Sequence, residues 1–118
     1  MKRDMDLIRK ILFAIEDNEH GYINHLPEIP GYSEEQVGYH CFLLHNARLI
    51  EGMNAANMGT SSPCYAPKYL TSAGHDFINM ARQDTLWKRA KDKVMEKGSE
   101  MTIELAMHAM KALLMSSN

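Results

Sequence analysis

The sequence is poor in cysteine and has no long apolar run, and both shortages exclude classes of protein. Only two cysteines are present, Cys41 and Cys64, so a disulfide-stabilised secreted scaffold is excluded and both thiols are expected to be reduced. No apolar stretch approaches the roughly 18 residues that a membrane span needs. Residues 1–10 mix acidic and basic side chains and place apolar ones at helical spacing, which is typical of neither a secretory signal nor a transit peptide. We therefore expect a cytoplasmic protein with no membrane association.

Basic residues are scarce in the middle of the chain. Between residues 11 and 81 only Arg48 and Lys68 are basic, against eight acidic residues, which gives a net charge of −6. Phosphate contacts from lysine and arginine supply most of the affinity of DNA-binding domains. A duplex would therefore meet an acidic surface here, because the basic residues gather in residues 2–10 and 88–97.

The motifs of catalysis are also missing. The segment from Gly52 to Gly59 lacks the lysine of a phosphate-binding loop. His75 and Asp76 are adjacent on an expected helix, which points their side chains about 100° apart, so they do not form a catalytic dyad. We expect no enzymatic activity and no cofactor.

Four side chains raise the question of a metal site. Cys41 and His45 lie at i and i+4, His40 is adjacent, and Cys64 could approach from a later loop. Against a metal, Cys41 lies on a predicted buried stripe and the sequence has no close-spaced second pair of ligands. We predict no metal. The remaining histidines, at positions 20, 25, 75 and 108, are scattered and are expected at the surface.

The apolar pattern of the N-terminal third predicts a helix followed by irregular chain. Asp4 is placed to cap a helix that ends near residues 17–20, with a buried face of Leu7, Ile8, Ile11, Leu12 and Ile15. Residues 22–24 are typical of a short strand. Pro27, Pro30 and Gly31 then prevent the helix that an ordinary helix-turn-helix would have at this place.

A central amphipathic helix is expected from Ser33 to about Arg48. Ser33 and Gln36 form a capping box, and Glu34 and Glu35 suit the positive end of the helix dipole. The spacing predicts one buried stripe, made of Val37, Cys41, Leu44 and Ala47. It leaves an outward face without lysine or arginine, made of Glu35, Tyr39, Phe42, His45 and Asn46.

The rest of the chain predicts a β-hairpin and three helices. Strands are expected over residues 49–53 and 64–70, joined by a polar loop over residues 54–63. Thr71 should cap a helix with Phe77, Ile78 and Ala81 inward, and Thr85 a helix with Leu86, Trp87, Ala90 and Val94 that ends at Gly98. The last helix begins at Ser99 or Thr102 and places Ile103, Ala106, Met110 and Leu113 on one face.

This order predicts a mainly α fold with a small antiparallel β-hairpin, an α+β arrangement of winged-helix type with extra C-terminal helices. We expect one structural domain, with a winged-helix-like core over residues 1–83 and a helical extension over residues 84–118. The extension either packs on the core or pairs with a second copy, and winged-helix regulators often form dimers through such terminal helices.

Two resemblances support this fold. Residues 39–50, YHCFLLHNARLI, and the phrase Leu70-Thr71-x-x-Gly74-x-x-Phe77 resemble the recognition helix, first wing strand and wing exit of bacterial winged-helix regulators. The phrases MKRDMDLIRKIL, GYSEEQVGYH, LTSAGHDFI and DTLWKRAK resemble a family of bacterial and phage genomes, the domain-of-unknown-function family 2513. This second resemblance implies a fold, a bacterial host and a prophage-like setting, but no activity. One departure is Arg48, which stands where the regulators have a left-handed glycine, so the helix end there is either strained or built differently.

Two functions fit these features. In the first, the chain docks on a protein partner of the host or phage through its central helix and wing, with Tyr39, Phe42, His45, Asn46 and Asn57 as contacts, since aromatic anchors dominate protein interfaces. In the second, the chain is a winged-helix transcriptional regulator that reads DNA with the same helix. Its phosphate contacts would then be Lys88, Arg89, Lys91 and Lys93. We favour the protein partner because the central helix carries no basic residue on its outward face.

Overall fold

The first helix begins at the aspartate that the sequence predicts as its cap. In the computed structural model, which describes residues 1–116, α1 spans Met5–Glu16. The Asp4 carboxylate accepts hydrogen bonds from the backbone N–H groups of Asp6 (3.0 Å) and Leu7 (3.1 Å), which satisfies donors that a helix start leaves unpaired. The helix buries its predicted face together with one further side chain: Met5, Leu7, Ile8, Ile11, Leu12 and Ile15.

The segment between α1 and the next helix has no regular structure. The prediction of a strand over residues 22–24 is wrong, because Ile23 makes a single ladder-like bond, from its N–H to the carbonyl of Lys68 (2.6 Å). Ile23 and Ile29 are nevertheless buried, so the segment covers the core. Gly31 turns the chain with a φ of +87°, a conformation that glycine adopts without a steric cost.

The central helix, α2, spans Glu34–Asn46 and has the predicted capping box. Gln36 N–H donates to the Ser33 hydroxyl (3.1 Å), and Ser33 N–H donates to the Gln36 side-chain carbonyl (2.8 Å). Of the predicted stripe, Val37, Cys41 and Leu44 are buried. Ala47 is exposed, contrary to prediction, because the helix ends one residue earlier and the chain turns away.

The end of α2 shows how the chain turns at Arg48 in place of the glycine of the regulators. Arg48 has a φ of +64°, in the left-handed region, and its N–H donates to the carbonyl of His45 (2.9 Å). Leu49 N–H donates to the carbonyl of Leu44 (3.0 Å), and the two bonds together form a Schellman motif. The helix end is therefore built as in the glycine-containing pattern, with a side chain in the position that favours glycine.

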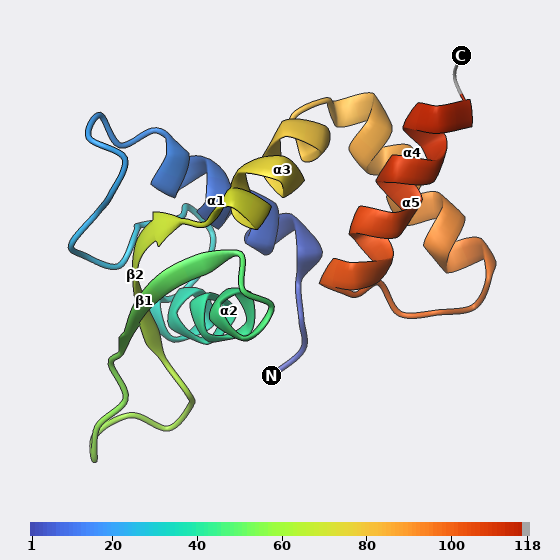
Figure 1. Cartoon of the computed structure of the whole chain (residues 1–118). Coiled ribbons are helices and arrows are strands. Elements are labelled where there is room, and N and C mark those ends of the chain that lie inside the picture. The colour runs from blue at the N-terminus through green and yellow to red at the C-terminus, as the bar shows by residue number, and fades with distance from the viewer. Residues whose placement is uncertain (117–118) are drawn as a thin grey trace. The chain divides into compact units, whose positions relative to one another are not determined.

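A β-hairpin follows directly, as Figure 1 shows. Strands β1 (Ile50–Asn54) and β2 (Tyr65–Leu70) pair antiparallel and form a two-stranded sheet within the described residues. Ile50 pairs with Leu70 and Asn54 with Tyr65, and an irregularity after Glu51 leaves Lys68 unmatched. This bulge frees the Lys68 carbonyl to accept the hydrogen bond from Ile23.

The exit from the hairpin is fixed by Thr71 and Gly74. The Thr71 hydroxyl donates to the carbonyl of Arg48 (2.7 Å) and accepts from the N–H of Gly74 (3.0 Å), while Thr71 N–H donates to the carbonyl of Leu49 (3.0 Å). A Cβ at Gly74 would collide with that same Leu49 carbonyl. These contacts explain the Thr-x-x-Gly phrase at the start of α3, which spans Ser72–Ala81.

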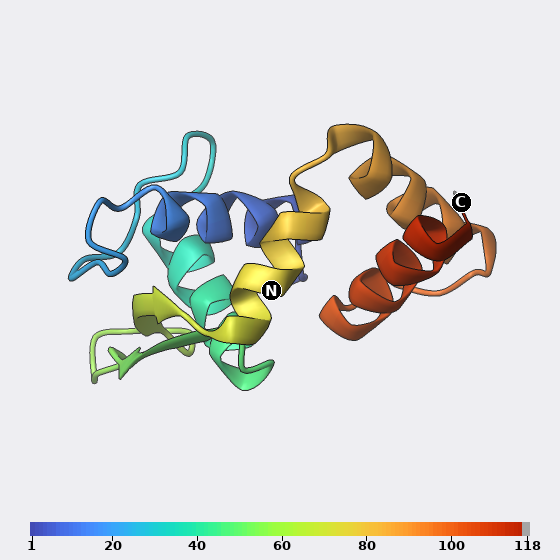
Figure 2. The same cartoon turned by 45° about the horizontal axis from the view of Figure 1, so that its top comes forward.

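Two more helices complete the chain. α4 spans Asp84–Glu96 and α5 spans Ile103–Ser116, and Figure 2 shows them side by side. Thr85 lies inside α4, so its prediction as the cap is wrong; Gln83 holds that position and makes no side-chain cap bond. The buried residues that the sequence predicts for α4 are confirmed, Leu86, Trp87, Ala90 and Val94, and Gly98 ends the helix with a φ of +75°.

The chain divides into two compact units, residues 1–75 and residues 76–118. In the first, α1, α2 and the hairpin enclose the core, with α1 above α2 and the hairpin below it in Figure 2. In the second, α4 packs on α5, and Phe77 meets Trp87 edge-on at 6.0 Å. The division lies within α3, earlier than the expected boundary after residue 83. The mainly helical α+β prediction is confirmed, and none of the helices in residues 1–116 has the length and apolar character to cross a membrane.

Candidate binding surface

Four aromatic rings from α2 and β2 form a contiguous group, which we call the aromatic cluster. Tyr39 and Phe42 have ring centroids 5.9 Å apart, and Phe42 and Tyr65 lie 6.0 Å apart. The His45 ring stacks on Tyr65 at 4.2 Å. All four rings are half-buried, so the prediction of a fully outward face is only partly right. Tyr65 covers part of this face of α2, and each of the four side chains keeps part of its surface exposed.

The loop of the hairpin forms a hollow beside this cluster. The hollow has a volume of about 400 Å³, and Phe42 and Tyr65 lie in its wall. The rest of the lining is small and uncharged: Asn54, Ala56, Asn57, Thr60, Ser61, Ser62, Pro63 and Cys64. The site therefore offers aromatic side chains together with amide and hydroxyl groups, and no charged group lines it.

Hydrogen bonds hold the loop in this shape. The Ser62 hydroxyl donates to the Glu35 carboxylate (2.6 Å), which ties the loop to the first turn of α2. Within the loop, the Asn57 side-chain carbonyl accepts from the N–H of Gly59 (2.7 Å), and the Thr60 hydroxyl donates to the Asn57 carbonyl (2.8 Å). Asn57 is thus an exposed residue that also braces the turn.

A buried histidine holds α2 in place behind the surface. His40 is 1% exposed; its Nδ1–H donates to the carbonyl of Gln36 (2.7 Å) and its Nε2 accepts from the N–H of Asp4 (2.8 Å). The Tyr32 hydroxyl donates to the Asp4 carboxylate (3.0 Å), so one aspartate joins α1, the preceding loop and α2. Burial lowers the pKa of His40, which keeps the ring neutral, and burial with the Asp4 bond raises the pKa of Tyr32.

The cysteines lie near each other on the inner side of the same region. The Cys64 sulfur rests against Gly38, where an added Cβ would lie 2.6 Å from it, one helical turn before Cys41. Burial raises the pKa of Cys41 to about 12 and also raises that of Cys64. Within the described residues, no group of three or more histidine, cysteine or acidic side chains is arranged to hold a metal.

The structure separates the predicted contacts into a cluster and outlying residues. It brings Tyr39, Phe42 and His45 together and places Asn57 in the hollow beside Phe42. Asn46 is exposed at the last position of α2. It does not line the hollow and takes no part in the ring contacts. Sequence reasoning missed Tyr65; its signal was an aromatic at the first position of the returning strand, where the side chain meets the preceding helix.

The predicted phosphate contacts are spread over different flanks of α4. Lys91 lies over the Trp87 ring, with its nitrogen 5.9 Å from the centroid. Lys93 lines a hollow between α4 and α5, whereas Lys88 and Arg89 are exposed. Because successive helical residues turn by about 100°, these four side chains do not share one face.

Comparisons with other proteins identify the family of this chain. The chain belongs to the family described as "Hypothetical protein (DUF2513)", whose sequence model matches residues 2–100. A protein of Haemophilus influenzae described as "Uncharacterized protein" is 32% identical over 105 residues, which cover 88% of this chain and 87% of that protein. No solved structure matches.

Proposed function

We propose that this chain is a non-enzymatic binding module that docks on a protein partner through the aromatic cluster and the hairpin loop. The observation that carries the proposal is the half-exposed cluster opening onto an uncharged hollow of about 400 Å³. Tyrosine and phenylalanine edges supply interface area at a low entropic cost, and asparagine and serine supply adaptable hydrogen bonds. Such a surface suits an uncharged segment of another protein.

The arrangement of elements supports a winged-helix-like frame for this surface. α2 stands where a recognition helix would be, the hairpin stands as the wing, and the Pro27 to Gly31 segment replaces the preceding helix. Ser62 ties the hairpin loop back to Glu35, and Tyr65 covers part of the outward face. Both contacts favour a docking surface over a helix that enters a DNA groove.

The test is a pull-down from bacterial lysate with three forms of the tagged chain. Ser61→Arg places a long charged side chain in the hollow at an exposed position and leaves the Asn57 bond that braces the turn in place. Asn24→Arg is the matched control, because Asn24 is also exposed and lies outside the hollow. We expect a protein that is recovered by the wild type and by Asn24→Arg and lost with Ser61→Arg. Recovery of nothing, or of the same proteins by all three forms, would contradict the proposal.

DNA binding is the second candidate, and the order of helices and hairpin is the observation that favours it. The net charge of −6 over residues 11–81 opposes it. A fluorescence anisotropy titration with random duplex at low salt should show salt-sensitive binding that weakens in Lys88→Gln/Arg89→Gln if DNA is the target. The absence of binding at low salt would contradict DNA binding.

The setting and the oligomeric state belong to the same proposal. We propose a cytoplasmic location in a bacterial host and a phage or prophage origin of the gene; the relative in Haemophilus influenzae supports the bacterial host. Homodimer formation through α5 is supported by two exposed apolar side chains near its end, Leu114 (39% exposed) and Met115 (78% exposed). Sedimentation measurements on the full chain would test the dimer.

A further inference from the structure

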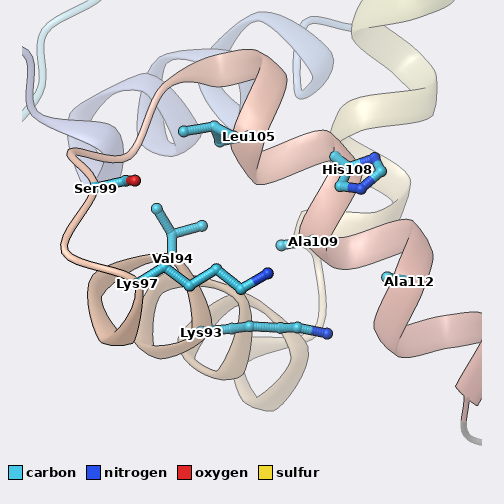
Figure 3. A pocket seen from close by; sticks show the side chains of 8 residues that line it. All are labelled: Lys93, Val94, Lys97, Ser99, Leu105, His108, Ala109 and Ala112. Carbon is cyan, nitrogen blue, oxygen red and sulfur yellow. The ribbon is translucent and has the colours of Figure 1, made fainter.

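A small hollow between α4 and α5 combines an apolar floor with basic side chains. Its volume is about 120 Å³, and Val94, Leu105, Ala109 and Ala112 supply the apolar part. Figure 3 shows Val94 and Leu105 reaching into it from opposite helices. Leu105 is 38% exposed although it lines the hollow, so its apolar surface lacks a cover.

The basic side chains lie along one side of this floor. Lys93 and Lys97, one helical turn apart, extend from the α4 side in the same direction in Figure 3. Lys93 is half-buried with its stem in the wall of the hollow, and Lys97 is exposed. His108 on α5 adds a ring nitrogen to the lining, and no acidic residue lines the hollow.

We propose that this hollow binds a small monocarboxylate with a short alkyl chain. A space of about 150 Å³ in a protein accepts a benzene-sized molecule, so a volume of 120 Å³ suits a tail of a few carbons. The tail covers Leu105 and Val94, and the carboxylate lies toward the Lys93 and Lys97 ammonium groups. Two positive charges on one side select an anion over an alcohol or amine of the same length.

The site is distinct from the aromatic cluster, and it does not depend on the proposed docking function. Its lining comes from the second unit, residues 76–118, whereas the aromatic cluster belongs to the first. The family model matches residues 2–100, whereas four residues that line the hollow lie after residue 100: Leu105, His108, Ala109 and Ala112. The family match therefore does not cover the α5 side of the hollow.

The test is an amide NMR titration of the full chain with hexanoate, and with hexylamine and 1-hexanol at matched salt. Hexanoate should give saturable shifts at Leu105, Ala109 and Lys93, while hexanol binds more weakly and hexylamine gives no saturation. The variant Lys93→Gln/Lys97→Gln should weaken hexanoate binding by about fivefold or more. Lys68→Gln/Lys88→Gln removes the same charge at two exposed positions that do not line the hollow and should leave the affinity unchanged.

Three outcomes would overturn the proposal. The first is the absence of saturable shifts with hexanoate at tens of millimolar, the range expected to reveal so small a ligand. The second is equal binding of hexanoate and hexylamine, since this would show that charge is not recognised. The third is equal weakening in both double variants, which would show a response to net charge alone.

Discussion

The Nε2 atom of His40 accepts a hydrogen bond from the backbone N–H of Asp4 at 2.8 Å. This bond joins the middle of α2 to the cap of α1 across 36 residues of sequence. The acceptor role of Nε2 requires a neutral ring, because Nδ1 already donates to the carbonyl of Gln36. Protonation of His40 would therefore place an N–H group at Nε2 facing the N–H group of Asp4, and this hydrogen bond would be lost.

The first prediction is a loss of stability in mild acid. Burial holds the folded-state pKa of His40 below its ordinary value of 6.5, so below that pH the unfolded chain binds more protons at this ring. The free energy of unfolding should fall as pH decreases below 6.5, and the loss should level off below the folded pKa. Urea unfolding at several pH values measures it.

Two variants separate His40 from other titrating groups. His40→Gln should lower stability at neutral pH and reduce the slope between pH 7 and about 5.5. His20→Gln should keep the wild-type slope, because His20 is exposed. An unchanged slope in His40→Gln would refute the assignment.

The second prediction concerns the left-handed residue at the end of α2. Arg48→Gly should raise the free energy of unfolding by about 0.5–1 kcal/mol, because the cost of a φ of +64° for an L-residue outweighs the extra freedom of glycine in the unfolded chain. Arg48→Ala, which keeps a Cβ, should give no such gain. Thermal unfolding checks both, and a loss of stability in Arg48→Gly would show that the arginine side chain makes a compensating contact.

The third prediction concerns the close approach at Gly74. Gly74→Ala should destabilise the protein by about 2–3 kcal/mol, because the new Cβ collides with the Leu49 carbonyl, a backbone atom that cannot move alone. Gly59→Ala is the control; its Cβ would meet only a side-chain oxygen of Asn57 at 3.2 Å and should cost about 0.5 kcal/mol or less. Equal effects of both variants in urea unfolding would contradict this explanation.

The fourth prediction concerns the thiols. At pH 8 iodoacetamide should label Cys64 slowly and leave Cys41 unmodified, because Cys41 is fully buried and its pKa of about 12 keeps it protonated. Both cysteines should react in denaturant. Mass spectrometry of digested samples measures each site, and faster labelling of Cys41 than of Cys64 in the folded protein would show that the α2 core opens.

Local signals in the sequence were enough to predict most of the fold. Ser33 with Gln36, and Asp4 at the start of α1, act over three residues or fewer, so their pattern is visible without a structure. The strand expected at residues 22–24 is absent because the segment makes a single ladder-like bond, from Ile23 to Lys68, and no local pattern shows how many partners a distant strand will offer. Gln83 rather than Thr85 precedes α4, a shift that propensity alone does not resolve.

The candidate site was less predictable, since it depends on contacts between distant segments. Periodicity correctly grouped Tyr39, Phe42 and His45 but could not show that Tyr65 covers two of them. His40 was considered only as a metal candidate, because its partner Asp4 lies 36 residues away. The hollow at the hairpin loop required the bond between Ser62 and Glu35, which spans 27 residues.

The contacts of Thr71 also have a consequence for the order of folding. Its hydroxyl caps α3 and at the same time holds the carbonyl of Arg48, 23 residues earlier. Closing a loop of this length costs conformational entropy that the hydrogen bonds of one helical turn do not offset. We therefore expect the first turn of α3 to become stable together with the hairpin, so that slowing hairpin closure delays protection of the Gly74 amide from hydrogen exchange.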